Sequence, residues 1–279
     1  MQAMKNEIEK LWITEQEILD VFRDVCSKYN LCYSLAYGTL IGAVRHGGFI
    51  PWDDDIDIMM PRKDYNTLLK IWSSVAPADY VIQDYNTDPN DYTNNFAKIR
   101  KNHTTFLQSE EERSRGYHKG IFIDIFPGDR RAPKGIARLY QYFACAVNLL
   151  YSRGYTSGAT GAMGIFERFL LRVSKDKQIK RRKQAERVLC KWNENKDAEW
   201  FFPCTIGSCK KFYPAGLFEA RTTMDFNGNV YYVTSDYDKV LRIEYGDYMQ
   251  LPPEEERVWK HHPILIDFER NYEEIVGGH

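Results

Sequence analysis

Apolar residues recur at helical spacing in the first 30 residues of the chain. From Ile18 to Cys26 they stand every three or four positions, which gives a helix one apolar face. Thr14 and Glu17 precede this stripe with the spacing of a capping box, in which each side chain bonds to backbone at the helix start. The pattern therefore predicts a helix that begins at Thr14 and ends near Asn30.

Short apolar runs bounded by turn residues predict strands further along. Polar and apolar residues alternate from Asp55 to Met60, as in a strand with two different faces. Helices are expected from Gly38 to Val44 and from about Tyr65 to Val75. Elements of both kinds are mixed without the repeated spacing of a doubly wound sheet, so the expected fold class is α+β with a mixed sheet. The predicted strands are Cys32–Tyr37, Asp55–Met60, Tyr80–Gln83, Asn95–Arg100 and Ile121–Phe126.

The pattern becomes helical from about Ala132 to Trp192, with a glycine-rich interruption at 154–164. That interruption lacks the Lys-Ser/Thr of a phosphate loop, so it predicts a flexible connection. The remaining signals are a strand at 230–233, a helix at 236–244 and a turn at 251–253. The expected organisation is a mixed core in residues 1–131, a helical insertion in 132–200 and a small C-terminal α/β part in 201–279.

Charge and composition exclude several classes of protein. Among 279 residues, 38 Lys+Arg oppose 39 Asp+Glu, and 43% are hydrophobic. A nucleic-acid coat needs a basic excess and a disordered chain has fewer apolar residues, so we expect a folded protein with no nucleic-acid partner. The N-terminus lacks an export signal, and the longest uncharged apolar run, 139–152, is too short to span a bilayer. We therefore expect a soluble, cytoplasmic protein.

Six cysteines are spread along the chain without a C-x-x-C pair. In a cytoplasmic protein of this length they are expected to be reduced thiols. Cys204 and Cys209 are close enough to form half of a zinc site, but no second pair stands at ligand spacing. Zinc is therefore the weaker interpretation of this pair.

The acidic run at 53–57 is the strongest local candidate for chemistry. On a strand, Asp55 and Asp57 project from the same face, and two carboxylates so close repel unless a cation lies between them. Oxygen ligands favour Mg²⁺ or Mn²⁺. The alternative is an exposed acidic turn, which is seldom followed by an apolar strand. The pattern therefore favours a metal site.

Asp124 stands alone in the apolar run from Phe122 to Phe126. Burial of an unpaired carboxylate costs several kcal/mol, so a cation or strong hydrogen bonds should face it. A third metal ligand is the simplest explanation. The alternative is an aspartate on the solvent face of an edge strand.

A longer run joins these residues into a recognisable signature. Gly38 and Thr39 follow a predicted strand and open a helix, so N–H groups and a hydroxyl are placed to hold an anion. The order Gly-Thr, Asp-x-Asp and a third Asp resembles the nucleotidyltransferase fold. The run YGTLIGAVRHGGFIPWDDDIDI at 37–58 resembles the signature of the LicD family of phosphocholine transferases, which includes the fukutin-related ribitol-phosphate transferases. Segments 96–105, 120–127 and 245–253, with His261-His262, are also similar.

The resemblance implies a nucleotidyltransferase-like core and transfer of phosphocholine, or a similar phospho-alcohol, from a CDP-activated donor such as CDP-choline. The acceptor would be a sugar hydroxyl of a lipid-linked teichoic acid or lipopolysaccharide precursor, and CMP would leave. Asp55, Asp57 and Asp124 would hold Mg²⁺, and Asp53 or Asp54 would take the acceptor proton. The alternatives are a nucleotidyltransferase that releases pyrophosphate and a non-catalytic nucleotide or metal sensor.

The same resemblance assigns cations and aromatic residues to the substrates. Arg45, Lys98 and Arg100 would contact phosphate oxygens, against the alternative of surface charge pairs. His261 and His262 would contact substrate, against the alternative of a structural turn. A choline headgroup needs aromatic side chains, and those nearest the acidic run in sequence are Tyr37, Trp52 and Tyr65, whose default role is core packing.

The basic segment 175–183 is a candidate for peripheral contact with the inner face of the membrane, where a lipid-linked acceptor would lie. A solvated helix face is the alternative.

Overall fold

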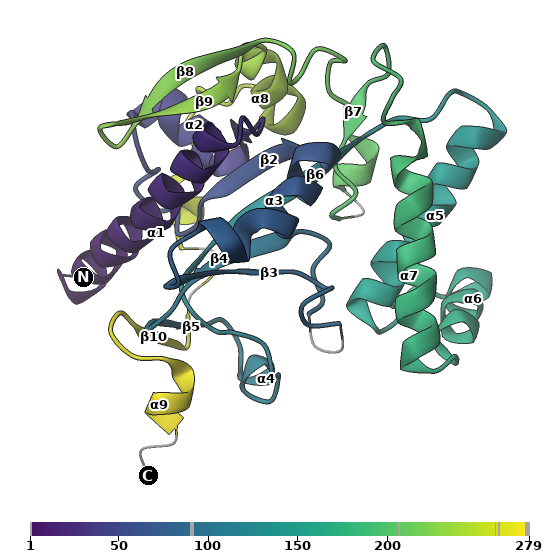
Figure 1. Cartoon of the computed structure of the whole chain (residues 1–279), viewed down its shortest axis with the longest axis horizontal. Coiled ribbons are helices and arrows are strands. Elements are labelled where there is room, and N and C mark those ends of the chain that lie inside the picture. The colour runs from purple at the N-terminus through teal and green to yellow at the C-terminus, as the bar shows by residue number, and fades with distance from the viewer. Residues whose placement is uncertain (1, 90–91, 206, 260, 262, 277–279) are drawn as a thin grey trace.

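The computed structural model describes residues 2–89, 92–205, 207–259, 261 and 263–276. A mixed β-sheet lies at the centre of the molecule, with strand order β1-β2-β6-β4-β3, and β7 also pairs with β6 (Figure 1). The pair β2–β6 is parallel and the other pairs are antiparallel, which confirms the expected α+β class. The strands are β1 (Ser34–Leu35), β2 (Asp57–Pro61), β3 (Tyr80–Gln83), β4 (Ala97–Lys101), β6 (Phe122–Arg130) and β7 (Trp200–Phe201).

Three helices pack around this sheet: α1 (Gln2–Lys28), α2 (Tyr37–His46) and α3 (Arg62–Val75). Helices α1 and α3 lie in front of the sheet in Figure 1. The prediction that the first helix begins at Thr14 is wrong, because Ile8 and Leu11 extend the buried stripe and the Thr14 hydroxyl donates to the Lys10 carbonyl at 3.0 Å. Helix α2 ends where predicted, at Gly47, which has a φ of +67°.

The C-terminal residues share the core of the sheet. The hairpin β8 (Arg221–Phe226) and β9 (Asn229–Thr234) places Phe226, Tyr231 and Val233 against the apolar residues of α1 and β1. The predictions of β9 and of α8 (Tyr237–Tyr245) are confirmed. A second small pair joins β5 (Thr105–Leu107) to β10 (Leu265–Asp267), with α4 (Glu110–Arg113) and α9 (Tyr272–Val276) beside it (Figure 1).

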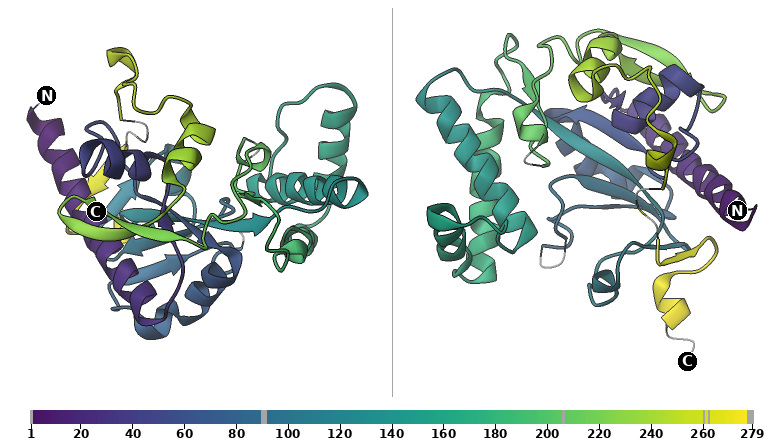
Figure 2. Two further views of the ribbon diagram at one scale, coloured as in Figure 1. Left: turned by 90° about the horizontal axis from the view of Figure 1, so that it is seen from above. Right: turned by 180° about the vertical axis from the view of Figure 1, so that it is seen from behind.

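Residues 136–189 form a helical lobe that stands to one side of the sheet (Figure 2). It contains α5 (Ile136–Arg153), α6 (Gly161–Leu171) and α7 (Lys175–Leu189), and α5 packs along α7. A separate apolar cluster holds these two helices to the segment after β7. Its buried members are Ala144, Cys145, Ala185, Leu189, Phe201 and Cys209.

A disulfide joins Cys145 to Cys209 within this cluster. The expectation that all six cysteines are reduced is therefore wrong for this pair. It also removes Cys209 from the zinc alternative that combined it with Cys204. The bond connects α5 to the C-terminal residues across 64 positions of sequence, so it anchors the lobe at its inner side.

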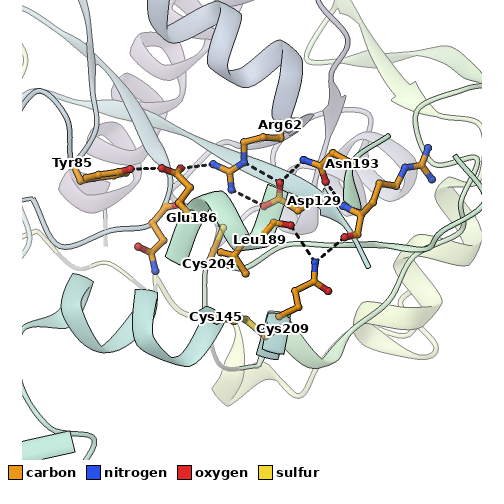
Figure 3. Close-up of polar contacts among 12 residues, drawn as sticks. Arg62, Tyr85, Asp129, Cys145, Glu186, Leu189, Asn193, Cys204 and Cys209 are labelled. Carbon is orange, nitrogen blue, oxygen red and sulfur yellow. Dashed lines mark hydrogen bonds and ion pairs between the residues drawn. A yellow bond between two sulfur atoms is a disulfide. The ribbon is translucent and has the colours of Figure 1, made fainter. Parts of the chain in front are cut away.

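Buried ion pairs anchor the lobe to the sheet (Figure 3). At the end of β6, Asp129 accepts two hydrogen bonds from Arg62, at 3.1 and 2.7 Å, and one from Asn193 at 2.8 Å. Arg62 also pairs with Glu186 of α7 at 2.9 Å, and the Tyr85 hydroxyl donates to Glu186. The start of α3, the end of β6 and α7 are thus joined by one network.

Candidate active site

A row of polar side chains crosses the middle of the sheet on neighbouring strands. We call Asp57, Asp124 and Lys98 the acidic row. Asp57 of β2 is the register partner of Asp124 of β6, which in turn is the partner of Lys98 of β4. The Lys98 ammonium group donates to Asp124 Oδ1 at 2.6 Å. All three side chains are buried, so a cation does face the buried Asp124 carboxylate, and it is Lys98, while the role of Asp124 as a third metal ligand stays a prediction.

The first turn of α2 positions the start of β2. The Thr39 hydroxyl accepts a hydrogen bond from the Asp57 N–H at 2.8 Å. A Cβ atom at Gly38 would lie 2.3 Å from Asp53 Oδ2, so only glycine lets the Asp53 carboxylate rest against the helix. The two residues therefore fix the acidic run, and because the Thr39 oxygen acts as an acceptor here, its O–H proton can still be donated to an anion.

The acidic run itself is a loop, not the start of a strand. Strand β2 begins at Asp57, so Asp55 lies in the loop before it, and the strand argument for its orientation is wrong. The ligand atoms of Asp54, Asp55 and His261 all lie within 4.8 Å of one another, as in a metal site. Asp55 therefore belongs to an acidic group that could bind a metal, although its partners there differ from those expected.

His261 is held by Asp54 through two contacts. Its backbone N–H donates to Asp54 Oδ2 at 3.0 Å, and its Nδ1 lies 3.0 Å from Asp54 Oδ1 and 3.7 Å from Asp55 Oδ2. The hydrogen bond with Asp54 raises the pKa of His261, although burial acts in the opposite direction. The contact joins residues 207 positions apart. The other histidine of the pair, His262, lies outside the described residues.

Burial and mutual repulsion raise the pKa values of the acidic residues. The pKa of Asp57 is well above its ordinary value because the side chain is buried and lies near Asp55 and Asp124. Burial also raises the pKa of Asp55 to about 6, with Asp124 adding to the shift and His261 opposing it. The cluster holds more negative charge than its protein surroundings compensate, which is the electrostatic condition that favours a bound cation.

The sequence analysis missed Glu15 as a member of this acidic group. It is buried on α1, and burial together with Asp55 and Asp54 raises its pKa well above the ordinary value. Its Oε2 atom is buried and has no hydrogen-bond partner among the described residues. One signal was present in the sequence, because Glu15 falls on the apolar stripe between Leu11 and Ile18.

The candidate phosphate-binding cations have different surroundings. Lys98 and Arg100 are both buried, so the alternative that they form surface charge pairs is wrong. Arg100 donates to Gln83 Oε1 and to the Gly120 carbonyl, each at 2.7 Å. Arg45 is half-buried and donates to the Tyr248 carbonyl at 2.6 Å. Lys98 is thus the cation within the acidic row, and Arg45 lies at the edge of the neighbouring cavity.

A cavity of about 500 Å³ opens beside the acidic loop. It brings α2 and the following loop, residues 38–53, together with residues 245–256, so two segments almost 200 positions apart in sequence line it. Aromatic rings and carboxylates both line it. Its lining includes Gly38, Arg45, Trp52, Asp53, Tyr245, Asp247, Tyr248 and Glu256.

Of the three aromatic residues nearest the acidic run, only Trp52 lines this cavity. Tyr65 is buried in the core, and Tyr37 packs edge-on against Phe126 with ring centroids 5.2 Å apart. The cavity adds Tyr245 and Tyr248, which are almost 200 residues away from Trp52 in the chain.

The comparisons with known proteins cover the segment that carries the sheet and the acidic row. A family model described as "LicD/FKTN/FKRP, nucleotidyltransferase domain" matches residues 30–135, the segment that contains β1 to β6. This defines the class of the domain. The chain is 30% identical to the lipopolysaccharide cholinephosphotransferase LicD of Haemophilus influenzae over 267 residues, which cover 90% of this chain and 96% of that protein. The chain therefore belongs to the LicD family.

Two shorter similarities involve uncharacterised proteins. The chain is 36% identical to a Rickettsia typhi protein over 64 residues and 32% identical to a Rickettsia prowazekii protein over 82 residues. These matches cover 21% and 31% of those proteins.

Across the part of the chain that the structure describes, no helix combines the length and apolar character required to cross a bilayer.

Proposed function

We propose that the protein transfers phosphocholine, or a similar phospho-alcohol, from a CDP-activated donor to a sugar hydroxyl of a lipopolysaccharide or teichoic acid precursor and releases CMP. The observation that carries this proposal is the buried row Asp57, Asp124 and Lys98 beside the acidic loop and its cavity, in a chain similar along most of its length to a lipopolysaccharide cholinephosphotransferase. We place the catalytic core in residues 1–131, with the C-terminal part completing the site.

The acidic residues fit a divalent metal ion. Asp55, Asp57 and Asp124 offer oxygen ligands, and burial, together with repulsion from neighbouring carboxylates, raises the pKa values of Asp55 and Asp57. Mg²⁺ or Mn²⁺ suits such ligands, and a bound ion would neutralise the diphosphate and the departing CMP. Asp54 of the same loop and His261 of the C-terminal segment lie near Asp55, so Asp55 stands where the two sets of ligands meet.

Lys98 is the residue of the acidic row that is suited to contact a phosphate group of the donor. Burial lowers its pKa, while the contact with Asp124 opposes that shift and keeps the ammonium group directed along the row. A phosphate oxygen bound beside Asp124 would therefore lie next to a positive charge. Arg45 would contact phosphate from the cavity side, and a role for Arg100 stays a prediction, because its Nε and Nη1 atoms donate within the protein.

The cavity suits the cationic headgroup of the donor. Trp52, Tyr245 and Tyr248 provide aromatic rings, and Asp53, Asp247 and Glu256 provide negative charge. A quaternary ammonium group is bound by such rings and carboxylates, because it cannot donate a hydrogen bond and is attracted to the ring faces. Substitution of Trp52 by alanine should raise KM for the donor more than it lowers kcat, because Trp52 contacts the headgroup and not the reacting phosphorus.

Among the two candidates for the general base, Asp53 is favoured. Both oxygens of Asp54 face His261, so its carboxylate is committed to holding that residue. Asp53 is buried against Gly38 and lines the cavity. A carboxylate in this place is suited to accept the proton of an acceptor hydroxyl as the phosphorus is attacked.

Product analysis tests the proposal directly. The protein is incubated with Mg²⁺, a panel of CDP-alcohols and glycan acceptors, and CMP and pyrophosphate are measured. CMP formed together with a phosphocholine-modified glycan is expected. Pyrophosphate would instead establish nucleotidyl transfer, and donor binding without consumption would establish a sensor. Asp79→Asn is the matched control, because Asp79 is exposed and precedes the edge strand β3 at the end away from Gln83, the register partner of Lys98.

A further inference from the structure

The helical lobe carries an apolar face that the rest of the described chain leaves exposed. On α5, residues Ile136, Leu139, Tyr140 and Phe143 recur at helical spacing and are all exposed, Ile136 by 86% and Leu139 by 68%. Gln141 and Cys145, which are buried towards α7, lie on the opposite side of the helix. The exposed stripe is therefore the outer face of an amphipathic helix.

Helix α6 continues this face. Phe166 lies beside Phe143, with ring centroids 6.3 Å apart, and Phe169 is 66% exposed. The inner side of α6 carries the polar Glu167, which accepts hydrogen bonds from Ser157 and pairs with Arg153 at 3.5 Å. Helix α6 thus turns its apolar side outward and its acidic residue inward, the reverse of an ordinary surface helix. Large exposed apolar patches on a protein mark interaction sites.

The charges around the patch indicate what covers it. Residues 132–191 contain 13 of the 38 Lys+Arg but only three of the 39 Asp+Glu, so the near-zero charge of the chain conceals a basic lobe. Helix α5 has no acidic residue, and Lys134, Arg168 and Arg172 are exposed near the ends of the two helices. Two copies placed face to face would bring these cations together, whereas an anionic lipid surface would attract them.

We propose that the α5–α6 face docks in the interfacial region of an anionic membrane. The patch is too small to cross a bilayer, but an amphipathic surface rimmed by lysine and arginine lies in the headgroup region. Strand β6 runs from Asp124 to the foot of the lobe at Arg130, a distance of about 20 Å at 3.3 Å per residue. The lobe would thus hold the acidic row at a fixed distance from the lipid.

This surface differs from the basic segment 175–183 that the sequence indicated. That segment begins α7, and its Arg182 is buried, where it donates to Asn95 Oδ1 at 2.8 Å and lies 4.1 Å from the Tyr85 ring centroid. Arg182 therefore joins the lobe to the sheet. Arg181, on the same face as Ala185, donates to the Tyr151 hydroxyl of α5 at 2.8 Å. The exposed Lys180 and Lys183 lie on the side of α7 away from Ala185 and Leu189. They do not rim the apolar face.

The test is co-sedimentation of the whole protein with vesicles of phosphatidylcholine, with and without phosphatidylglycerol. Binding to the anionic vesicles at low salt, weakened by added salt, is expected. The variant Leu139→Gln/Phe143→Gln/Phe169→Gln should bind at least about tenfold more weakly. Neutralisation of Lys134, Arg168 and Arg172 to glutamine should weaken binding about fivefold per cation. Circular dichroism and urea unfolding check that each variant is folded.

Two controls separate this proposal from its rivals. Ile13→Gln/Val230→Gln removes exposed apolar residues outside the lobe and should bind as the unaltered protein does. Lys177→Gln/Lys180→Gln/Lys183→Gln should weaken binding less than the rim variant. The proposal is overturned if anionic vesicles are not bound, if the apolar variant binds unchanged, or if the face instead mediates self-association in analytical ultracentrifugation. None of these results depends on catalysis.

Discussion

Strand β6 carries two buried aspartates, and they differ in how their charge is compensated. At the lobe end, Asp129 accepts two hydrogen bonds from Arg62 and one from Asn193, so both of its oxygens are satisfied by the protein. In the middle of the sheet, Asp124 faces Lys98, but Asp57 on the next strand and Asp55 on the loop add further carboxylates. One strand therefore contains a neutralised acid and an acid within an excess of negative charge.

The difference separates structure from function. Arg62 keeps its charge at every accessible pH, and although burial lowers its pKa, Asp129 raises it well above the ordinary value. That pair attaches the lobe to the sheet. In contrast, repulsion within the acidic row lowers the free energy of unfolding when no cation is bound. Proteins keep such unfavourable charges at sites that bind a ligand. Substitutions at Asp129 and in the acidic row should therefore differ in their effects on stability and on turnover.

The largest expected effect is on turnover at the acidic row. Asp57→Asn should lower kcat by at least about a thousandfold, because a metal ligand and its charge are lost. The same change should raise the free energy of unfolding of the metal-free protein by about 1 kcal/mol, because a carboxylate with a raised pKa destabilises the folded state above that pKa. Steady-state kinetics and urea unfolding measure the two effects.

Binding of a divalent metal ion provides a second test of the same row. Mg²⁺ or Mn²⁺ should raise the melting temperature of the unaltered protein and of Asp79→Asn, and the shift should vanish in Asp57→Asn. A variant with normal turnover, or an unchanged metal shift in Asp57→Asn, contradicts the proposed role of the row.

The next largest effect concerns Asp129. Asp129→Asn leaves the charged Arg62 buried beside a neutral amide and should lower the free energy of unfolding by about 3 kcal/mol. Asp124→Asn is the matched change on the same strand and should cost less, because the Asp55 carboxylate still lies near the Lys98 ammonium group. Urea unfolding measures the free energy of unfolding of both variants. Equal decreases would contradict the inference that Asp129 and Asp124 are compensated differently.

The aspartates of the acidic row could be predicted from sequence, because each stands out against its immediate neighbours in the chain. Asp124 stands out because one carboxylate interrupts five residues of a strand, and the alternation from Asp55 to Met60 located β2 to within two residues. The cation that faces Asp124 could not be chosen from sequence, because Lys98 is brought to it by antiparallel pairing. Burial of Lys98 and Arg100 became evident only when β4 was placed inside the sheet.

Contacts between distant segments set the limit of the sequence analysis. Asp54 and His261 meet across 207 residues, and no spacing rule connects them. The cavity likewise combines Trp52 with Tyr245 from α8. Two local signals were nevertheless overlooked. Glu15 lies on an apolar helical stripe, and Asn227-Gly228, with φ values of 54° and 81°, is a typical hairpin turn that predicts both β8 and β9.

A smaller effect is expected at His261. His261→Ala removes the group that holds Asp54 and lies 3.7 Å from Asp55, so metal affinity or turnover should fall by about ten- to a hundredfold. His261→Asn keeps a hydrogen-bond donor towards Asp54 and should recover part of the loss. Metal titration followed by activity measures it. An undiminished rate in the alanine variant would show that the Asp54, Asp55 and His261 group lies outside the functional site.

The smallest effect is a pH dependence of stability at the segment that leads into β6. His118 Nδ1 accepts the Gly120 N–H at 2.9 Å, and burial lowers its pKa to about 4, so the folded protein keeps this ring neutral. The unfolded chain, with a pKa near 6.5, binds a proton first as the pH falls, and stability is lost from about pH 6.5 down to pH 4. The unaltered protein should lose about 2 kcal/mol more stability between pH 7 and pH 5 than His118→Gln, whose amide oxygen can still accept the Gly120 N–H. Urea unfolding at the two pH values compares them. Parallel pH profiles would mean that protonation of His118 does not destabilise this end of the strand, and the acid sensitivity of β6 would then belong to its carboxylates alone.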